Sequence, residues 1–152
     1  MWPSTGSKGV TNGCGLAFDA KNHVLFAYYR LPSPSVVIVN AGNGNIIATL
    51  PTAMNIDTVA FNPATTEAIS AATGGSMVFI KEKSPTSFVE EQRLQTMLGA
   101  RTLDLDTKTN HLLTMAFEYG PLPANAPPPP VGGVALGPVV PGSFSILMMG
   151  KQ

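Results

Sequence analysis

Short apolar runs separated by turn-forming residues follow one another along most of the chain. Each run has four to seven residues and is bounded by Gly, Pro, Asn or Ser, a pattern that predicts β-strands. No segment sustains the period of an amphipathic helix. The nearest helical candidate is 88–97, but its place in the repeat described below favours a long outer strand. The predicted strands are 16–19, 24–29, 36–39, 46–50, 59–62, 68–73, 77–80, 88–94, 103–106, 112–117 and 144–149.

The same order of runs occurs three times. The first run, 16–19, recurs as 59–62 and as 103–106, with spacings of 43 and 44 residues. A polar turn and two further runs follow in every unit, and a fourth run follows only in the first two units. Four antiparallel strands in about 40–45 residues are typical of one blade of a β-propeller. A single β-sandwich whose strands resemble one another by chance is the alternative.

The turn after the first run begins in each unit with Asp or Asn, namely Asp19, Asn62 and Asp106. Such side chains can accept hydrogen bonds from backbone N–H groups that follow them, and this favours a turn. His23 and His111 are interpreted as equivalent residues at the exits of these turns, with Glu67 at that place in the second unit. Two histidines one blade apart at the surface do not predict a shared metal site.

Three stretches carry a resemblance to a known family: 13–19, 57–63 and 99–106. Together with the hairpin at 37–44, they resemble the YncE-like, or YVTN-repeat, bacterial β-propellers, a WD40-like architecture. The family usually has Asp where Asn40 stands here. The resemblance extends over roughly residues 13–150 and implies a mostly non-enzymatic protein, often exported. It therefore implies a periplasmic or extracellular location, although this chain begins with no signal peptide.

The expected fold is all-β: β-propeller blades of four-stranded antiparallel sheets, incomplete at about three blades. We expect an N-terminal lead-in at 1–12 and a partial propeller at 13–152. The blades are expected at about 13–52, 56–96 and 100–150, with a Pro-rich insertion at 121–142. Members of the family usually have seven blades in a chain about twice as long.

Propellers close with typically four to eight blades, so three blades leave two open apolar faces. We expect either the C-terminal part of a longer propeller or a protomer that completes a ring with copies of itself. The partner is then the missing blades or the chain itself.

The Pro-rich run contains Pro127 to Pro130 and predicts a polyproline-like surface loop without ladder hydrogen bonds. It is interpreted either as a site for a protein partner or as a flexible insertion without a ligand. The family resemblance also carries a proline-rich loop near this place, which favours a native feature.

Composition limits the function further. The chain has 152 residues, of which 12% are charged, and its net charge is zero. This balance gives no electrostatic reason to expect nucleic acid or an acidic membrane as a partner, and no apolar run is long enough to span a bilayer. Cys14 is the only cysteine, which excludes an internal disulfide framework and a cysteine-rich zinc site.

The candidate site is the channel mouth, where the inner strands of the blades begin. The repeat places Cys14, Asp57 and Arg101 at equivalent positions there, and Asp104 occupies the slot held by alanine in the other units. A small molecule or peptide is the expected ligand, since arginine offers a planar fork for carboxylate or phosphate. The alternative is a structural Asp57–Arg101 contact between adjacent blades, or charged side chains that are solvated at the rim. Cys14 is expected to pack as a small apolar residue.

Two function classes remain. The first is a non-enzymatic binding or scaffold module, because no catalytic, metal-binding or cofactor-binding motif is found in the sequence. The second is part of a lactonase-like or isomerase-like propeller enzyme that uses Asp57, Arg101 and Asp104 together with a divalent metal at the channel mouth. A third reading is a truncated gene product without activity of its own.

Overall fold

The computed structural model describes residues 11–129 and 133–150, and within them every regular element is a β-strand. All the strands predicted from the sequence are present, including the long outer strand in place of a helix at 88–97. Over the described part of the chain there is no helix of the length and hydropathy that crossing a membrane requires. The eleven strands are β1 (Thr11–Asp19), β2 (Val24–Leu31), β3 (Ser35–Asn40), β4 (Ile46–Pro51), β5 (Ile56–Asn62), β6 (Glu67–Ala72), β7 (Ser76–Ser84), β8 (Ser87–Gln95), β9 (Thr102–Asp106), β10 (His111–Ala116) and β11 (Ser145–Met149).

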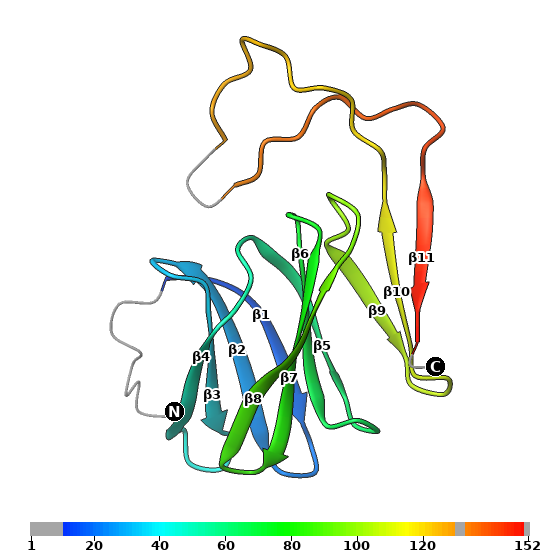
Figure 1. Ribbon diagram of the computed structural model, residues 1–152. Helices are drawn as coiled ribbons and strands as arrows, with labels where there is room; N and C mark the ends of the chain where they lie inside the picture. Colours follow the sequence, from blue (N-terminus) through cyan, green and yellow to red (C-terminus); the bar gives the residue numbers. More distant parts are fainter. Residues whose placement is uncertain (1–10, 130–132, 151–152) are drawn as a thin grey trace.

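The strands form three separate antiparallel sheets, which we call blades 1, 2 and 3 (Figure 1). Their strand orders are β1-β2-β3-β4, β5-β6-β7-β8 and β9-β10-β11, so each blade is a simple meander. The first strands lie next to one another, β1 against β5 and β5 against β9. Within the described residues blade 3 has three strands. This confirms an all-β fold of propeller-type blades that do not close into a ring.

The core lies between the blades. One apolar cluster joins blades 1 and 2 through large side chains such as Phe26, Tyr28 and Ile80. A second cluster joins blades 2 and 3 through Ile69, Phe79 and Leu112, among others. Every residue of β6 in the middle blade is buried, since that blade is covered on both faces. Burial on both faces of a strand explains why the charged fraction of the chain is low.

Gly15 permits the close approach of the inner strands of blades 1 and 2. A Cβ atom at this position would lie 2.7 Å from Cγ2 of Val59 on β5, well inside van der Waals contact. Any larger residue at Gly15 therefore requires the Val59 side chain or the two strands to shift.

The three inner hairpin turns share one hydrogen-bond pattern. Oδ1 of Asp19 accepts the N–H of the residue two positions later at 2.8 Å, and Asn62 and Asp106 do the same at 3.0 and 2.9 Å. This confirms the predicted role of Asp and Asn at these turns.

The interpretation of His23 and His111 as equivalent residues is wrong by one position. Each inner turn ends in a residue with positive φ, and the three are His23, Thr66 and Asn110, with φ of 55°, 52° and 59°. His111 follows that residue and pairs with Asp106, as Val24 pairs with Asp19. The first two units are 43 residues apart and the last two are 44 apart, so the counterpart of His23 in the third unit is Asn110 and not His111.

The segment between β10 and β11 rises above the end of the blades at which the inner strands begin (Figure 1). The prediction that it makes no ladder hydrogen bonds is wrong at its base. Tyr119 and Val139 form an antiparallel bridge, Gly120 N–H donates to the Pro138 carbonyl at 2.8 Å, and Val140 N–H donates to the Glu118 carbonyl at 2.9 Å. Of the proline run, the structure describes Pro127 to Pro129, and the described residues 124–129 belong to no strand.

The two outermost blade faces expose large apolar side chains. On blade 1, Leu16 is 66% and Phe18 49% exposed, and both lie on the face directed away from blade 2. On blade 3, Met115, Ile146 and Met148 lie on one face of the sheet and are 45%, 66% and 66% exposed. In the described residues, neither outermost blade therefore carries a polar face that would end the stack of blades.

Candidate functional site

The inner strands present Cys14, Asp57 and Arg101 at the same end of the three blades. Cys14 and Asp57 each occupy an irregularity in the pairing of the first two strands, between Gly13 and Gly15 in blade 1 and between Ile56 and Thr58 in blade 2. Arg101 directly precedes β9. β-bulges redirect a side chain out of the regular alternation of a strand. The repeated bulge therefore positions Cys14 and Asp57 equivalently, as the sequence repeat predicts.

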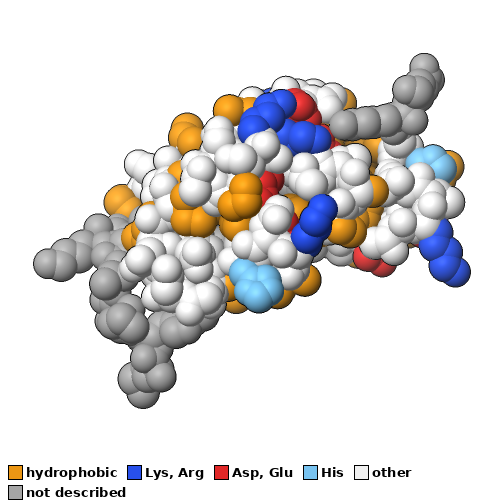
Figure 2. Space-filling view, turned by 90° about the horizontal axis from the view of Figure 1, so that it is seen from below, with side chains coloured by type: hydrophobic (Ala, Val, Ile, Leu, Met, Phe, Trp, Pro, Cys, Tyr) orange, Lys and Arg blue, Asp and Glu red, His pale blue; other side chains and the backbone are white. Residues whose placement is uncertain are grey.

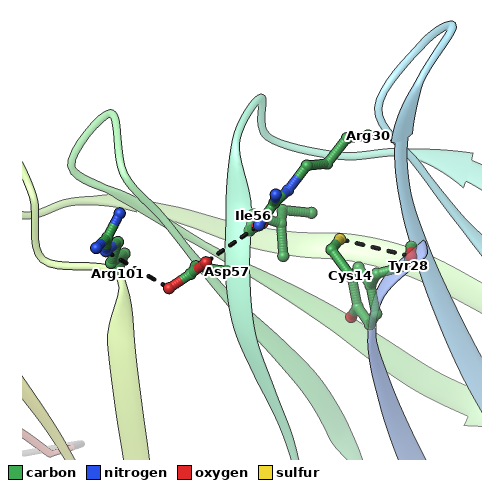
Figure 3. Close-up of polar contacts among 6 residues, drawn as sticks. All are labelled: Cys14, Tyr28, Arg30, Ile56, Asp57 and Arg101. Carbon is green, nitrogen blue, oxygen red and sulfur yellow. Dashed lines mark hydrogen bonds and ion pairs between the residues drawn. The ribbon is translucent and has the colours of Figure 1, made fainter. Parts of the chain in front are cut away.

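Asp57 lies between two arginines from different blades (Figure 3). The Arg30 guanidinium donates through Nη2 to Asp57 Oδ1 at 3.1 Å and through Nε to the Ile56 carbonyl at 2.7 Å. Nε of Arg101 lies 3.5 Å from Asp57 Oδ2. The carboxylate thus joins blade 1 to blade 3 across the start of blade 2. The side chains are 30%, 37% and 53% exposed for Arg30, Asp57 and Arg101, so each ion pair contributes at most about 1 kcal/mol.

Cys14 lies beside this cluster but is engaged with the backbone. Its thiol donates to the Tyr28 carbonyl at 3.5 Å (Figure 3). Burial raises the pKa of the Cys14 thiol, and the positive charge of Arg30 opposes that rise only in part. A raised pKa keeps the thiol protonated, which disfavours a role as a nucleophile.

Asp104 lies apart from the Asp57 cluster. It pairs across the sheet with Leu113, is exposed, and accepts the N–H of Leu105 at 2.8 Å. Its counterpart Ala17 is buried against blade 2, so the Asp104 position is the one that faces a following blade. Among the described residues no ion pair joins Asp104 to Arg101.

Arg30 is the site residue that the sequence pattern did not single out. It ends an apolar run in the first unit, whereas the corresponding positions in the other units are Thr73 and Phe117. A charge at this position in the first unit, where the other two units are uncharged, is the sequence signal that points to Arg30. Its contact with Asp57 could not be foreseen, because it depends on how blades 1 and 2 stack.

The described residues contain no group of three or more His, Cys, Asp and Glu side chains placed to hold a metal ion. Figure 2, which looks at the opposite end of the blades, shows histidine side chains in two separate places and no single region of one charge. The Asp57 cluster consists of one carboxylate and two guanidinium groups, which offer hydrogen bonding and charge recognition. Arg101, the most exposed member, presents donors suited to a carboxylate or phosphate.

We expect the Arg30→Met variant to alkylate more slowly at Cys14 than the wild-type chain at the same pH. Arg30 lowers the pKa of the thiol by its charge and by a hydrogen bond, so its loss should raise that pKa further. The rate of reaction with iodoacetamide across pH 7–10 measures this directly, since Cys14 is the only thiol. Arg101→Met is the control and should keep the wild-type rate profile; a faster reaction in Arg30→Met would contradict the assignment.

Comparison with solved structures finds similar architecture in β-propeller domains. The β-propeller domain of Cps50 (Swd1) from Myceliophteria thermophila matches with a TM-score of 0.56 and 13% identity, covering 70% of this chain and 37% of that domain. The WD40 domain of Pan2 from Neurospora crassa matches with a TM-score of 0.56 and 13% identity, covering 79% of this chain and 34% of that domain. The fold is that of a partial β-propeller.

At this level of identity the likeness concerns the fold alone. The chain spans somewhat over a third of each of these two propeller domains. No family model and no curated protein matches the sequence. The WD40-like architecture expected from the repeat is confirmed, while the narrower YncE-like resemblance remains an expectation.

Proposed function

We propose that this chain is a non-enzymatic binding or scaffold module that contributes about three blades to a larger β-propeller ring. The observation that carries the proposal is the exposure of apolar residues on both outermost blade faces. The repeat counterparts of these residues are buried where two neighbouring blades pack on each other. Such faces mark interfaces or lead to aggregation.

The face of blade 1 matches the repeat positions that blade 2 uses to pack on blade 1. Phe61 is the counterpart of Phe18, and its ring stacks on Phe26 of blade 1 at a centroid distance of 5.7 Å. Leu103 in blade 3 is a counterpart of Leu16 and is only 6% exposed against blade 2. Residues of this type and position pack on a preceding blade, so blade 1 is suited to pack on one as well.

The face of blade 3 matches the positions that blade 2 presents to blade 3. Met77 and Phe79 are the counterparts of Ile146 and Met148, and both are buried in the second apolar cluster. The two outermost faces are thus complementary in kind: one can receive the other in the same geometry that joins the blades within the chain.

Two routes can complete the ring. In the first, the chain is the C-terminal part of a longer bacterial propeller of the YncE-like kind; the fractional coverage of the similar domains, about a third, supports this route. In the second, copies of the chain associate head to tail, and two copies would give about six blades, within the usual range for closure. In either case, the Asp57, Arg30 and Arg101 cluster, with Cys14 beside it, would lie at a channel mouth. Asp104 would face the next blade. We propose a small molecule or peptide with an anionic group as the ligand at that mouth.

Light scattering of the purified chain tests the completion of the ring. We expect association at micromolar concentration, and we expect the Ile146→Lys/Met148→Lys double variant to weaken it at least tenfold, because it places two charges on the open face of blade 3. Met54→Lys is the matched control, since Met54 is 63% exposed in the loop between β4 and β5, away from both faces.

The mass of the wild-type assembly separates the two routes. A compact particle of two protomers favours self-association, and a polydisperse series favours a longer propeller that lacks its other blades. A soluble wild-type monomer at high concentration that binds no hydrophobic dye would overturn the proposal.

A further inference from the structure

The connection between the second and third strands is much longer in blade 3 than in the other blades. In blades 1 and 2 it has three residues, 32–34 and 73–75, whereas in blade 3 it has 28 residues, 117–144. We call the segment 117–144 the arm. Since three residues are enough to join these two strands, most of the arm is not needed to build a blade.

The base of the arm is an ordered stem. The rings of Phe117 and Phe144 lie directly beyond the last paired residues of β10 and β11, with a centroid distance of 5.5 Å. The bridge between Tyr119 and Val139 continues the pairing. A Cβ atom at Gly99, in the turn before β9, would lie 2.7 Å from the hydroxyl oxygen of Tyr119, so this side chain packs on the turn. The stem therefore supports the rest of the arm above the end of the blades (Figure 1).

Beyond the stem, the arm presents prolines and no charge. Eight of the 14 prolines of the chain lie within 121–141, and no charged residue occurs within 119–150. The described residues 121–125 and 127–129 are exposed, and Leu122 is 49% exposed between two prolines. Proline has a backbone carbonyl but no N–H group, so successive prolines present acceptors and ring surface without donors.

The prolines do not suit the contacts that hold a propeller together. Because Pro127 to Pro129 have no N–H groups, a strand of a further blade or of a second copy cannot form a regular ladder with them. Runs of proline favour the extended polyproline II helix, which has no internal hydrogen bonds. Its φ angles are fixed before binding, so little conformational entropy is lost when a partner binds. Protein domains that recognise such segments do so with grooves lined by aromatic side chains.

We propose that Pro127 to Pro129 of the arm bind a protein domain that has an aromatic-lined groove for polyproline II segments. The run follows a turn in which the Ala126 N–H donates to the Pro123 carbonyl at 2.9 Å, so its start is held by the arm itself. Aromatic rings of the groove pack on the proline rings, and indole N–H or phenol O–H groups donate to the free carbonyls. The site uses neither the outermost blade faces nor the channel mouth, so the inference goes beyond the proposed function.

A purified WW domain and a purified EVH1 domain, each carrying a fluorescent label, are the probes. Fluorescence anisotropy during titration with the full chain should show saturable binding of at least one of them. The triple variant Pro127→Ala/Pro128→Ala/Pro129→Ala should weaken this binding at least tenfold, because it frees the φ angles and removes the proline rings.

Pro85→Ala is the matched control. Pro85 is also exposed, but it lies in the turn between β7 and β8, so this variant should keep wild-type binding. A synthetic peptide with the sequence of residues 121–129 provides a second measurement that does not depend on the folding of a variant. It should compete with the wild-type chain for the same domain.

Several results would overturn the proposal. These are no saturable binding of either domain, full binding by the triple variant, or no competition by the peptide. The mass of the triple variant is measured by light scattering in parallel and should equal that of the wild-type chain. A smaller assembly in the triple variant would assign the arm to contacts between copies of the chain instead. The test of ring completion depends on other residues, so the two proposals can fail separately.

Discussion

Replacing Phe26 with alanine should lower the free energy of unfolding by about 3 to 5 kcal/mol, the usual effect of removing a fully buried aromatic side chain. Phe26 is 0% exposed and stands at the centre of the interface between blades 1 and 2. Its ring stacks on Phe61 at an interplanar angle of 23° and meets Phe88 at 82°. The substitution removes both ring contacts and leaves a cavity that two rigid sheets cannot easily close. Urea denaturation followed by circular dichroism measures the change.

Phe18→Ala is the matched control. Phe18 lies in the same blade but on the open face, where its ring is 49% exposed. At concentrations where the chain is monomeric, this change should cost less than about 1 kcal/mol, because little apolar area is lost from the core. Equal losses in the two variants would show that the interior of this fold is not the space between the blades.

The strands and their order could be predicted because the repeat supplies three versions of the same pattern. A single run such as 68–73 is ambiguous between a buried helix segment and a strand. Its alignment with 24–29 and 112–117 removes the ambiguity, since all three follow a turn opened by Asp or Asn. The structure confirms β2, β6 and β10 at these places.

The candidate site could be predicted only as far as the repeat fixes positions along the strands. Cys14 and Asp57 were correctly aligned, because a bulge is a local feature that each unit repeats. Arg30 was not found, because its contact with Asp57 joins residues 27 positions apart in different blades. Whether these residues bind a ligand stays a prediction.

Contacts that cross between blades are the part that the sequence does not disclose, and two buried acidic residues from different blades are an example. Asp19 on β1 and Glu82 on β7 stand 63 residues apart in the sequence. Both are buried, with exposed fractions of 3% and 5%. Asn22 donates through Nδ2 to Glu82 Oε1 at 2.9 Å. The repeat predicts the turn role of Asp19, but nothing in the sequence pattern places Glu82 near it.

The free energy of unfolding should therefore fall as pH rises from about 5 to 8. Burial, and secondly the charge of Asp19, raise the pKa of Glu82 to about 7 from its ordinary value of 4.5. A carboxyl group whose pKa is raised in the folded state stabilises the fold while it is protonated in the folded state, and this stabilisation is lost as pH rises through the folded-state pKa. The shift corresponds to a loss of about 1 to 3 kcal/mol over this range. Urea denaturation at pH 5, 6, 7 and 8 measures the slope.

Glu82→Gln separates this carboxyl group from all others that titrate. A glutamine keeps the shape and can still accept from Asn22, but it carries no proton that is lost, so the slope between pH 5 and 8 should largely disappear and the variant should exceed the wild-type chain in stability at pH 8. Glu90→Gln is the control, because Glu90 is exposed on β8 in an ion pair with Arg93 and should keep the wild-type slope. Parallel profiles for the wild-type chain and Glu82→Gln would refute the assignment. The opposite sign of slope would mean that Glu82 is held charged between the blades, which the contact with Asp19 disfavours.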